Sequence, residues 1–161
     1  MTAAVSSWAS SPTPSDRRAV AALLGRAPAA DYRVAVRCPH GTPAVIENAP
    51  RDAAGRPFPT RHWLVCRRLS EAVSHLEAAG GVRALEADEA MTEHLADAHR
   101  RHGALHEGYR VAGSGDPAHV KCLHAHLAFA LASGGGAVAE WIAARTDLGW
   151  PDRCCAEEAG G

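Results

Sequence analysis

The sequence predicts an α+β fold, with a small antiparallel sheet of about three strands near the N-terminal half packed against a helical majority. Residues 32–66 contain three short segments of strand character, separated by turns rich in proline and glycine. Residues 67–149 instead repeat apolar side chains at helical spacing and are interrupted by glycine stops. The chain has 161 residues and is 47% hydrophobic, which is enough to bury one core.

We expect one domain over residues 15–150, preceded by a mobile segment and followed by a short tail. Residues 1–14 are rich in serine, proline and alanine, and residues 151–161 are short and polar. Ser15 is expected to cap a first helix that ends at Gly25.

Three strands are expected to follow this helix, over residues 32–38, 44–48 and 61–66. The first alternates apolar and polar side chains, as a half-buried strand does. Residues 39–43 are Pro-His-Gly-Thr-Pro, a turn sequence, so the first two strands should form a hairpin. The loop 49–60 contains three prolines and cannot lie inside a sheet.

The second half is expected to contain four helical segments, over residues 67–81, 82–112, 116–133 and 137–149. The longest is polar and should break near Asp88 or Gly103. The third should begin at Asp116 or Pro117. It should end at the glycines 134–136, which lack the preceding strand and the following Lys-Ser/Thr of a phosphate-binding loop.

Charge and cysteine content exclude several classes of protein. The formal net charge is −1, so no strong field attracts nucleic acid or anionic lipid. No segment approaches the roughly 20 apolar residues of a membrane span, and the N-terminus lacks a secretory signal. We therefore expect a cytoplasmic protein with no nucleic-acid or membrane partner. Five cysteines, an odd number, argue against a disulfide framework and for reduced or metal-bound thiols.

Two blocks of the sequence carry a family resemblance. Residues 36–81 contain Arg-Cys-Pro-His-Gly-Thr-Pro, Pro-Phe-Pro-Thr, Trp-Leu-Val-Cys and Val-Ser-His-Leu-Glu, and residues 119–134 contain Val-Lys-Cys-Leu-His. With the weaker element at 105–110, these blocks resemble an uncharacterised bacterial family known as domain of unknown function 501. The resemblance spans roughly residues 15–140 and implies a small cytoplasmic protein without a settled activity. The segment 133–141 departs from the family pattern, which often has Asn-Pro-x-Gly there.

The cysteines and histidines of these blocks predict a metal site. Cys38 lies in a tight turn, and Cys122 lies where the positive end of a helix favours a thiolate. Three thiolates and one imidazole form a common structural zinc site, whereas three thiolates with an open position suit an iron–sulfur cluster. The predicted ligands are Cys38, Cys66, Cys122 and His124. Without a Cys-x-x-Cys pair the fold must assemble the site, and the alternative is that all three cysteines are core residues.

The fourth ligand has several candidates. If Cys122 lies inside a helix, geometry favours His126, four residues on, or His119, three residues back. The resemblance favours His124, and both views hold if Cys122 precedes the helix. Cys154 and Cys155 are alternates, although a solvent-exposed pair is the expected state of a short polar tail.

Other polar residues are weaker candidates. Arg37, Lys121 and Tyr109 are expected to bind a ligand near the cysteines. Three further histidines form one stripe of a helix, which should be solvated or half-buried: His99, His102 and His106.

Three functions agree with these observations. The first is a zinc-stabilised interaction or regulatory protein, acting on an unknown protein or small molecule. The second is a zinc- or iron–sulfur-dependent enzyme with an open coordination position. The third is a metal-free thiol sensor. Four protein ligands on the metal would favour the first function, and three with an open position would favour the second. The absence of a metal would favour the third.

Overall fold

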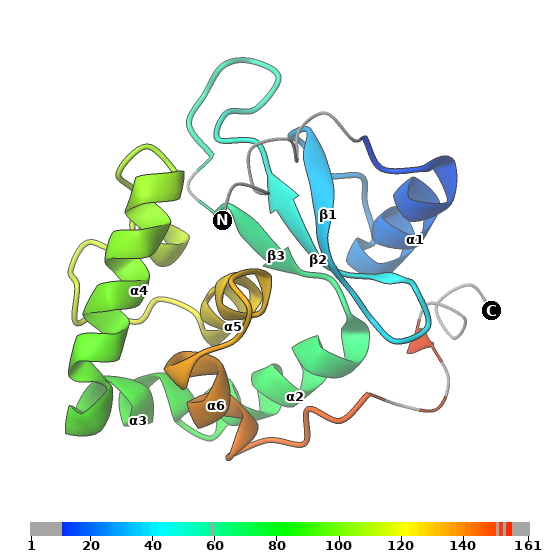
Figure 1. Ribbon diagram of the computed structural model, residues 1–161. Coiled ribbons are helices and arrows are strands. Elements are labelled where there is room, and N and C mark those ends of the chain that lie inside the picture. Colours follow the sequence, from blue (N-terminus) through cyan, green and yellow to red (C-terminus); the bar gives the residue numbers. More distant parts are fainter. Residues whose placement is uncertain (1–10, 59, 151, 153, 156–161) are drawn as a thin grey trace.

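The computed structural model describes residues 11–58, 60–150, 152, 154 and 155. It confirms the α+β prediction (Figure 1). The elements, in chain order, are α1 Pro14–Leu24, β1 Tyr32–Arg37, β2 Pro43–Asn48, β3 His62–Leu64, α2 Arg67–Ala78, α3 Gly81–Ala87, the 3-10 turn η2 Glu89–Met91, α4 Thr92–Leu105, the 3-10 turn η3 Val111–Gly113, α5 Leu123–Ala132 and α6 Ala137–Ala143. The expectations for residues 1–10 and for most of the tail lie outside the described residues.

The sheet has the order β1-β2-β3 and is antiparallel throughout, so the predicted hairpin is confirmed. All six residues of the central strand β2 are buried. Successive side chains of a strand point to opposite faces. Ile46 accordingly packs with Val20 of α1, whereas Val45 joins the larger core that contains Leu127 of α5. Helices α1 and α5 therefore cover opposite faces of the sheet (Figure 1).

Helix α5 lies at the centre of the molecule (Figure 1). It contacts β3, α2 and α6. Seven of its ten residues are buried: Leu123, Ala125, His126, Leu127, Ala128, Phe129 and Ala130. A helix that is apolar on all sides belongs in a core, and this one is nearly so.

Two helices begin elsewhere than the sequence predicts. The cap of α1 is Thr13, not Ser15, because the Thr13 hydroxyl accepts from the Asp16 N–H while the Asp16 carboxylate accepts from the Thr13 N–H. Helix α5 begins at Leu123, not at Asp116 or Pro117. The expected break near Asp88 is confirmed, where an extended residue separates α3 from η2.

A buried carboxylate joins the three strands. Glu47 of β2 accepts hydrogen bonds from Arg33 of β1 and, at 2.8 Å, from Arg61 beside β3. Burial alone would raise the pKa of Glu47, but the hydrogen bonds from His62 and Arg61 and the nearby charges lower it to about 2. Arg61 also donates to the Leu105 carbonyl at 2.6 Å, which ties the sheet to the end of α4. A buried charge is tolerated here because it is paired.

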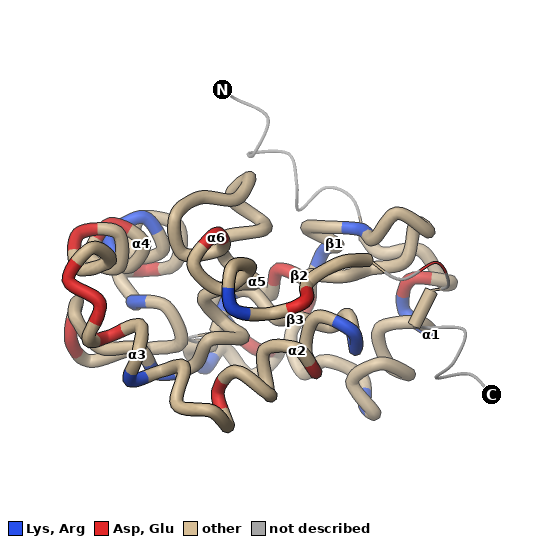
Figure 2. Tube along the Cα trace, turned by 90° about the horizontal axis from the view of Figure 1, so that it is seen from below, with Lys and Arg blue, Asp and Glu red and all other residues tan. Residues whose placement is uncertain are grey.

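Charged residues elsewhere are mixed in sign. Figure 2 shows acidic and basic residues interspersed over α3 and α4. Within the described residues, no helix combines the length and the apolar character that crossing a bilayer requires.

The histidine stripe of α4 faces inward, so the expectation of a solvated or half-buried face is wrong. His99, His102 and His106 are each at most 2% exposed. The ring of His102 lies 5.3 Å from that of Phe129 and 5.4 Å from that of His106. Its Nδ1–H donates to the Tyr109 carbonyl at 2.6 Å. These rings fill the space between α4 and α5, so they are part of the core.

Burial makes the stability of this core depend on pH. It lowers the pKa of His102 from 6.5 to about 4, helped by the charges of His106, His62 and Arg61. Between these two values the unfolded chain takes up a proton that the folded protein excludes. The free energy of unfolding should therefore fall as the pH drops through this window, by roughly 3 kcal/mol for this one group.

Urea unfolding of His102→Asn, measured from pH 7 to pH 4, tests this prediction. The amide can still donate to the Tyr109 carbonyl but takes up no proton, so the dependence of stability on pH should become weaker. His94→Asn, at an exposed position of the same helix, is the control and should keep the wild-type slope. Equal slopes in both variants would contradict the prediction.

Candidate metal centre

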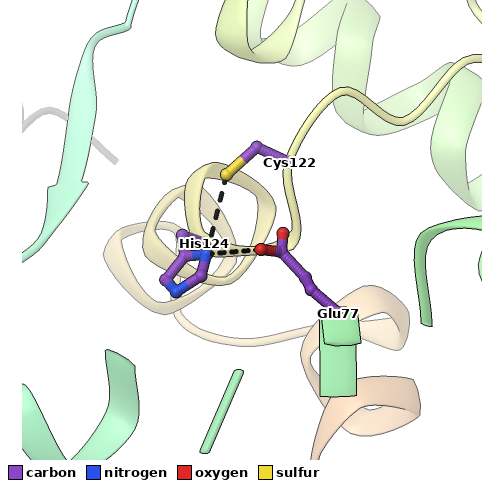
Figure 3. A group of neighbouring side chains, drawn as sticks. All are labelled: Glu77, Cys122 and His124. Atoms are coloured by element: carbon purple, nitrogen blue, oxygen red, sulfur yellow. Dashed lines mark hydrogen bonds and ion pairs between the residues drawn. The ribbon is translucent and has the colours of Figure 1, made fainter. Parts of the chain in front are cut away.

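Three side chains that bind metals converge between α2 and α5: Glu77, Cys122 and His124 (Figure 3). The Cys122 Sγ lies 3.7 Å from the His124 Nδ1, which lies 3.1 Å from the Glu77 Oε1. Their ligand atoms are all within 4.8 Å of one another, and no other group of three such side chains meets this condition among the described residues. Each side chain is half-buried, so the group is neither in the core nor fully in water.

The start of α5 brings the thiol and the imidazole together. Two residues of a regular helix that are two positions apart point about 200° from each other. Cys122 is instead the extended residue before the helix, with φ −160° and ψ 125°. Its thiol can therefore meet the ring of His124, as the sequence analysis allowed for a cysteine that precedes the helix.

Glu77, in the last turn of α2, contacts this helix start. Its Oε2 accepts from the Leu123 N–H at 2.7 Å, at the positive end of α5. Gly81 lies close to both elements, because a Cβ there would be 2.7 Å from the Leu76 carbonyl oxygen and 3.0 Å from the Leu123 Cδ1. A larger residue would thus push α2 and α5 apart next to Glu77.

The hydrogen bonds of His124 leave one nitrogen for the site. Its Nε2 lies 3.1 Å from the Ser70 carbonyl oxygen and 3.1 Å from the Ser74 hydroxyl. A carbonyl oxygen only accepts, so Nε2 carries the hydrogen. In the neutral ring, Nδ1 then directs its lone pair toward Cys122 and Glu77, which is the arrangement of a metal-binding histidine.

The electrostatics of the group agree with this arrangement. The hydrogen bond with Cys122 raises the pKa of His124, burial opposes the rise, and the charge of Glu77 adds to it. A positive charge is thus favoured at the point where the three side chains meet. A divalent cation bound at this point would supply such a charge.

A pocket of about 290 Å³ opens beside the group. Cys122 and His124 line one side of it, Trp63 and Leu64 of β3 another, and Arg26, which follows α1, its rim. A metal held by the three side chains would therefore lie next to a space that can hold a small molecule.

The structure brings together two of the four predicted ligands. Cys38 and Cys66 lie in the hydrophobic core instead, with Cys66 only 2% exposed. Burial raises the pKa of the Cys66 thiol to about 11. Its Sγ lies 3.8 Å from the Sγ of Cys155.

The other predicted residues lie outside this group. Arg37 pairs with Asp16 at 2.8 Å, the Tyr109 carbonyl accepts from His102, and Lys121 is exposed beside Cys122. His126 faces away from the group, with its ring 5.1 Å from that of His99.

The tail cysteines are not the exposed pair that the sequence suggested. Cys154 is 4% exposed, and its thiol donates to the Thr42 hydroxyl at 2.9 Å. Cys155 is half-buried against Cys66. Cys154 lies against the turn after β1 and Cys155 against the start of α2, and these contacts shield both thiols from solvent.

Glu77 is the site residue that the sequence analysis missed. It ends the Val-Ser-His-Leu-Glu element of the first block, and that element also supplies Ser74. The signal was therefore present in the quoted motif. Glu77 was not predicted as a ligand because a single carboxylate near a helix end is common in proteins.

Comparison with known proteins agrees with the family resemblance of the first sequence block. Residues 34–112 match the family described as protein of unknown function (DUF501). The match includes Glu77 and ends before Cys122. The chain matches no curated protein and no solved structure.

Proposed function

We propose a function from the geometry of the site, because the family that residues 34–112 match is described only as a protein of unknown function (DUF501). The protein binds one zinc ion through Glu77, Cys122 and His124. The fourth coordination position is open toward the neighbouring pocket, where a small molecule or a water binds the metal. The protein thus acts through a metal centre of the catalytic type rather than a closed structural one.

One observation carries this proposal: a carboxylate from α2, an imidazole from α5 and the thiol of the residue before α5 meet with their ligand atoms within 4.8 Å. All three are established zinc ligands. The hydrogen bond from Nε2 of His124 to the Ser70 carbonyl fixes the ring as metal-binding histidines are fixed. A single thiolate does not suit an iron–sulfur cluster, which needs several. Zinc is therefore the better match.

The open position determines what the centre can do. Zinc with three protein ligands can polarise a bound carbonyl or lower the pKa of a bound water toward 7, about where the water becomes a nucleophile. Of the three functions considered from the sequence, the second, an enzyme with an open position, has the best support from this geometry.

The test is zinc content and zinc affinity in protein purified without oxygen or chelator. We expect one zinc per chain, and a loss of affinity of at least about tenfold in Glu77→Gln and in Cys122→Ser. Glu71→Gln, one and a half turns earlier on the same helix, is the matched control and should bind zinc as the wild type does. Circular dichroism would show that each variant folds.

Two results would contradict the proposal. One is wild-type protein that neither contains nor binds zinc. The other is zinc that survives Glu77→Gln but is lost in Cys38→Ser and Cys66→Ser, because the ligands would then be those predicted from the sequence.

A second candidate function, a thiol sensor, is favoured by the 3.8 Å between the Sγ atoms of Cys66 and Cys155. A disulfide needs about 2.05 Å, so a small movement closes it. A peroxide would oxidise the half-buried thiol of Cys155 to a sulfenic acid and leave as water. Cys66 would then attack that sulfur, forming the disulfide and releasing a second water.

Intact mass after treatment with hydrogen peroxide tests this candidate. We expect the loss of two hydrogen atoms, and a peptide map that joins Cys66 to Cys155. Cys155→Ser should abolish the cross-link, whereas Cys154→Ser, at the adjacent position, should preserve it. A cross-link that involves Cys154 or Cys122, or none at all, would contradict it.

A further inference from the structure

We propose that the pocket beside the metal centre binds a small organic acid, with its carboxylate at Arg26 and its apolar part against Trp63. This inference rests on the proposed function, because it names the class of molecule that reaches the open metal position. Three features of the pocket support it: its place in the fold, an unpaired cation, and its walls.

The pocket lies at a seam between the two layers of the molecule. Strand β3 is an edge of the sheet. The end of α1 reaches this edge from one face and the start of α5 from the other. Cys122, His124 and Ala125 line the pocket from the start of α5, opposite Trp63 and Leu64 of β3.

Arg26 supplies a positive charge at the rim. It follows Gly25, whose φ of 76° ends α1 and turns the chain. The guanidinium carbon lies 5.4 Å from the centre of the Trp63 ring. No acidic side chain pairs with Arg26 among the described residues, although Arg33, Arg37 and Arg61 are all paired. Its donors are thus available to a carboxylate.

A buried histidine forms part of the pocket wall. His62 lines the pocket, and its side chain is only 4% exposed. The Nε2 lies 3.4 Å from the Glu47 carboxylate, but Nδ1 is buried and has no hydrogen-bond partner among the described residues. Because Nε2 faces a carboxylate, which only accepts, Nε2 carries the hydrogen and Nδ1 is an acceptor buried within the protein. His62 thus forms part of the pocket wall, and its Nδ1 is not a contact for a carboxylate.

The remaining walls select for an apolar body of modest size. Leu24, Trp63, Leu64 and Ala125 provide apolar surface around the two polar groups. A volume of about 290 Å³ is at the small end of ligand pockets. A molecule the size of benzoate fits this space and can extend from Arg26 toward Cys122 and His124.

Benzoate and its neutral isostere benzamide test the inference, by calorimetry or ligand-observed NMR on the full chain. Benzoate should bind at least about tenfold more tightly than benzamide, which is the value of one charge-assisted hydrogen bond. Arg26→Gln should remove that preference. Arg18→Gln, at an exposed position of α1, should leave it unchanged.

Three results would overturn the inference: no binding of benzoate at millimolar concentration, equal binding of benzoate and benzamide, or equal behaviour of Arg26→Gln and Arg18→Gln. The zinc-loaded and the chelated protein separate this inference from the proposed function. An Arg26-dependent preference in a chain that binds no zinc would support the acid site and reject the metal. Zinc binding without a preference for benzoate would support the metal centre and reject the acid site.

Discussion

The burial of α5 is the constraint on which the rest of the structure depends. The helix is covered by the sheet on one side and by α2, α4 and α6 around it (Figure 1). Its apolar residues provide much of the larger core, and Phe129 extends that core toward α4. Every polar side chain on such a helix must find a partner or remain unsatisfied at a cost. The positions of Cys122, His124 and His126 follow from this requirement.

The polar side chains at the start of α5 and those in its interior meet this requirement differently. At the start of the helix, Glu77 caps the Leu123 N–H and also contacts His124, so one carboxylate meets both a structural and a chemical need. Deeper in the core, His126 meets other imidazoles, and neither of its ring nitrogens has a partner among the described residues. Burial keeps such rings neutral and links the stability of the core to pH. The proposed metal centre thus lies at the solvent-facing end of a helix whose interior excludes charge.

Much of the fold could be predicted from the sequence, because the decisive signals are local. The hairpin follows from the Pro-His-Gly-Thr-Pro turn, and α2 follows from its apolar spacing and its glycine stop. The errors lie where two local signals compete. Thr13 is the cap of α1 because it and Asp16 exchange two hydrogen bonds, whereas Ser15 lies inside the helix. Residues 116–122 resemble a helix start, yet Cys122 is extended and Val120 donates its N–H to Glu86 instead.

The sequence by itself determined the α+β class, the order of the elements and the pairing of Cys122 with His124 as neighbours in one motif. Only the tertiary structure decided which groups join them. Glu77 is 45 or more positions away and meets them because α2 packs along α5. Cys66 was a predicted ligand, but it lies in the core. It precedes α2 and is therefore at the opposite end of that helix from Glu77. Periodicity and turn residues describe contacts a few positions apart. A site made of several segments depends on how buried surfaces pack, which no local pattern contains.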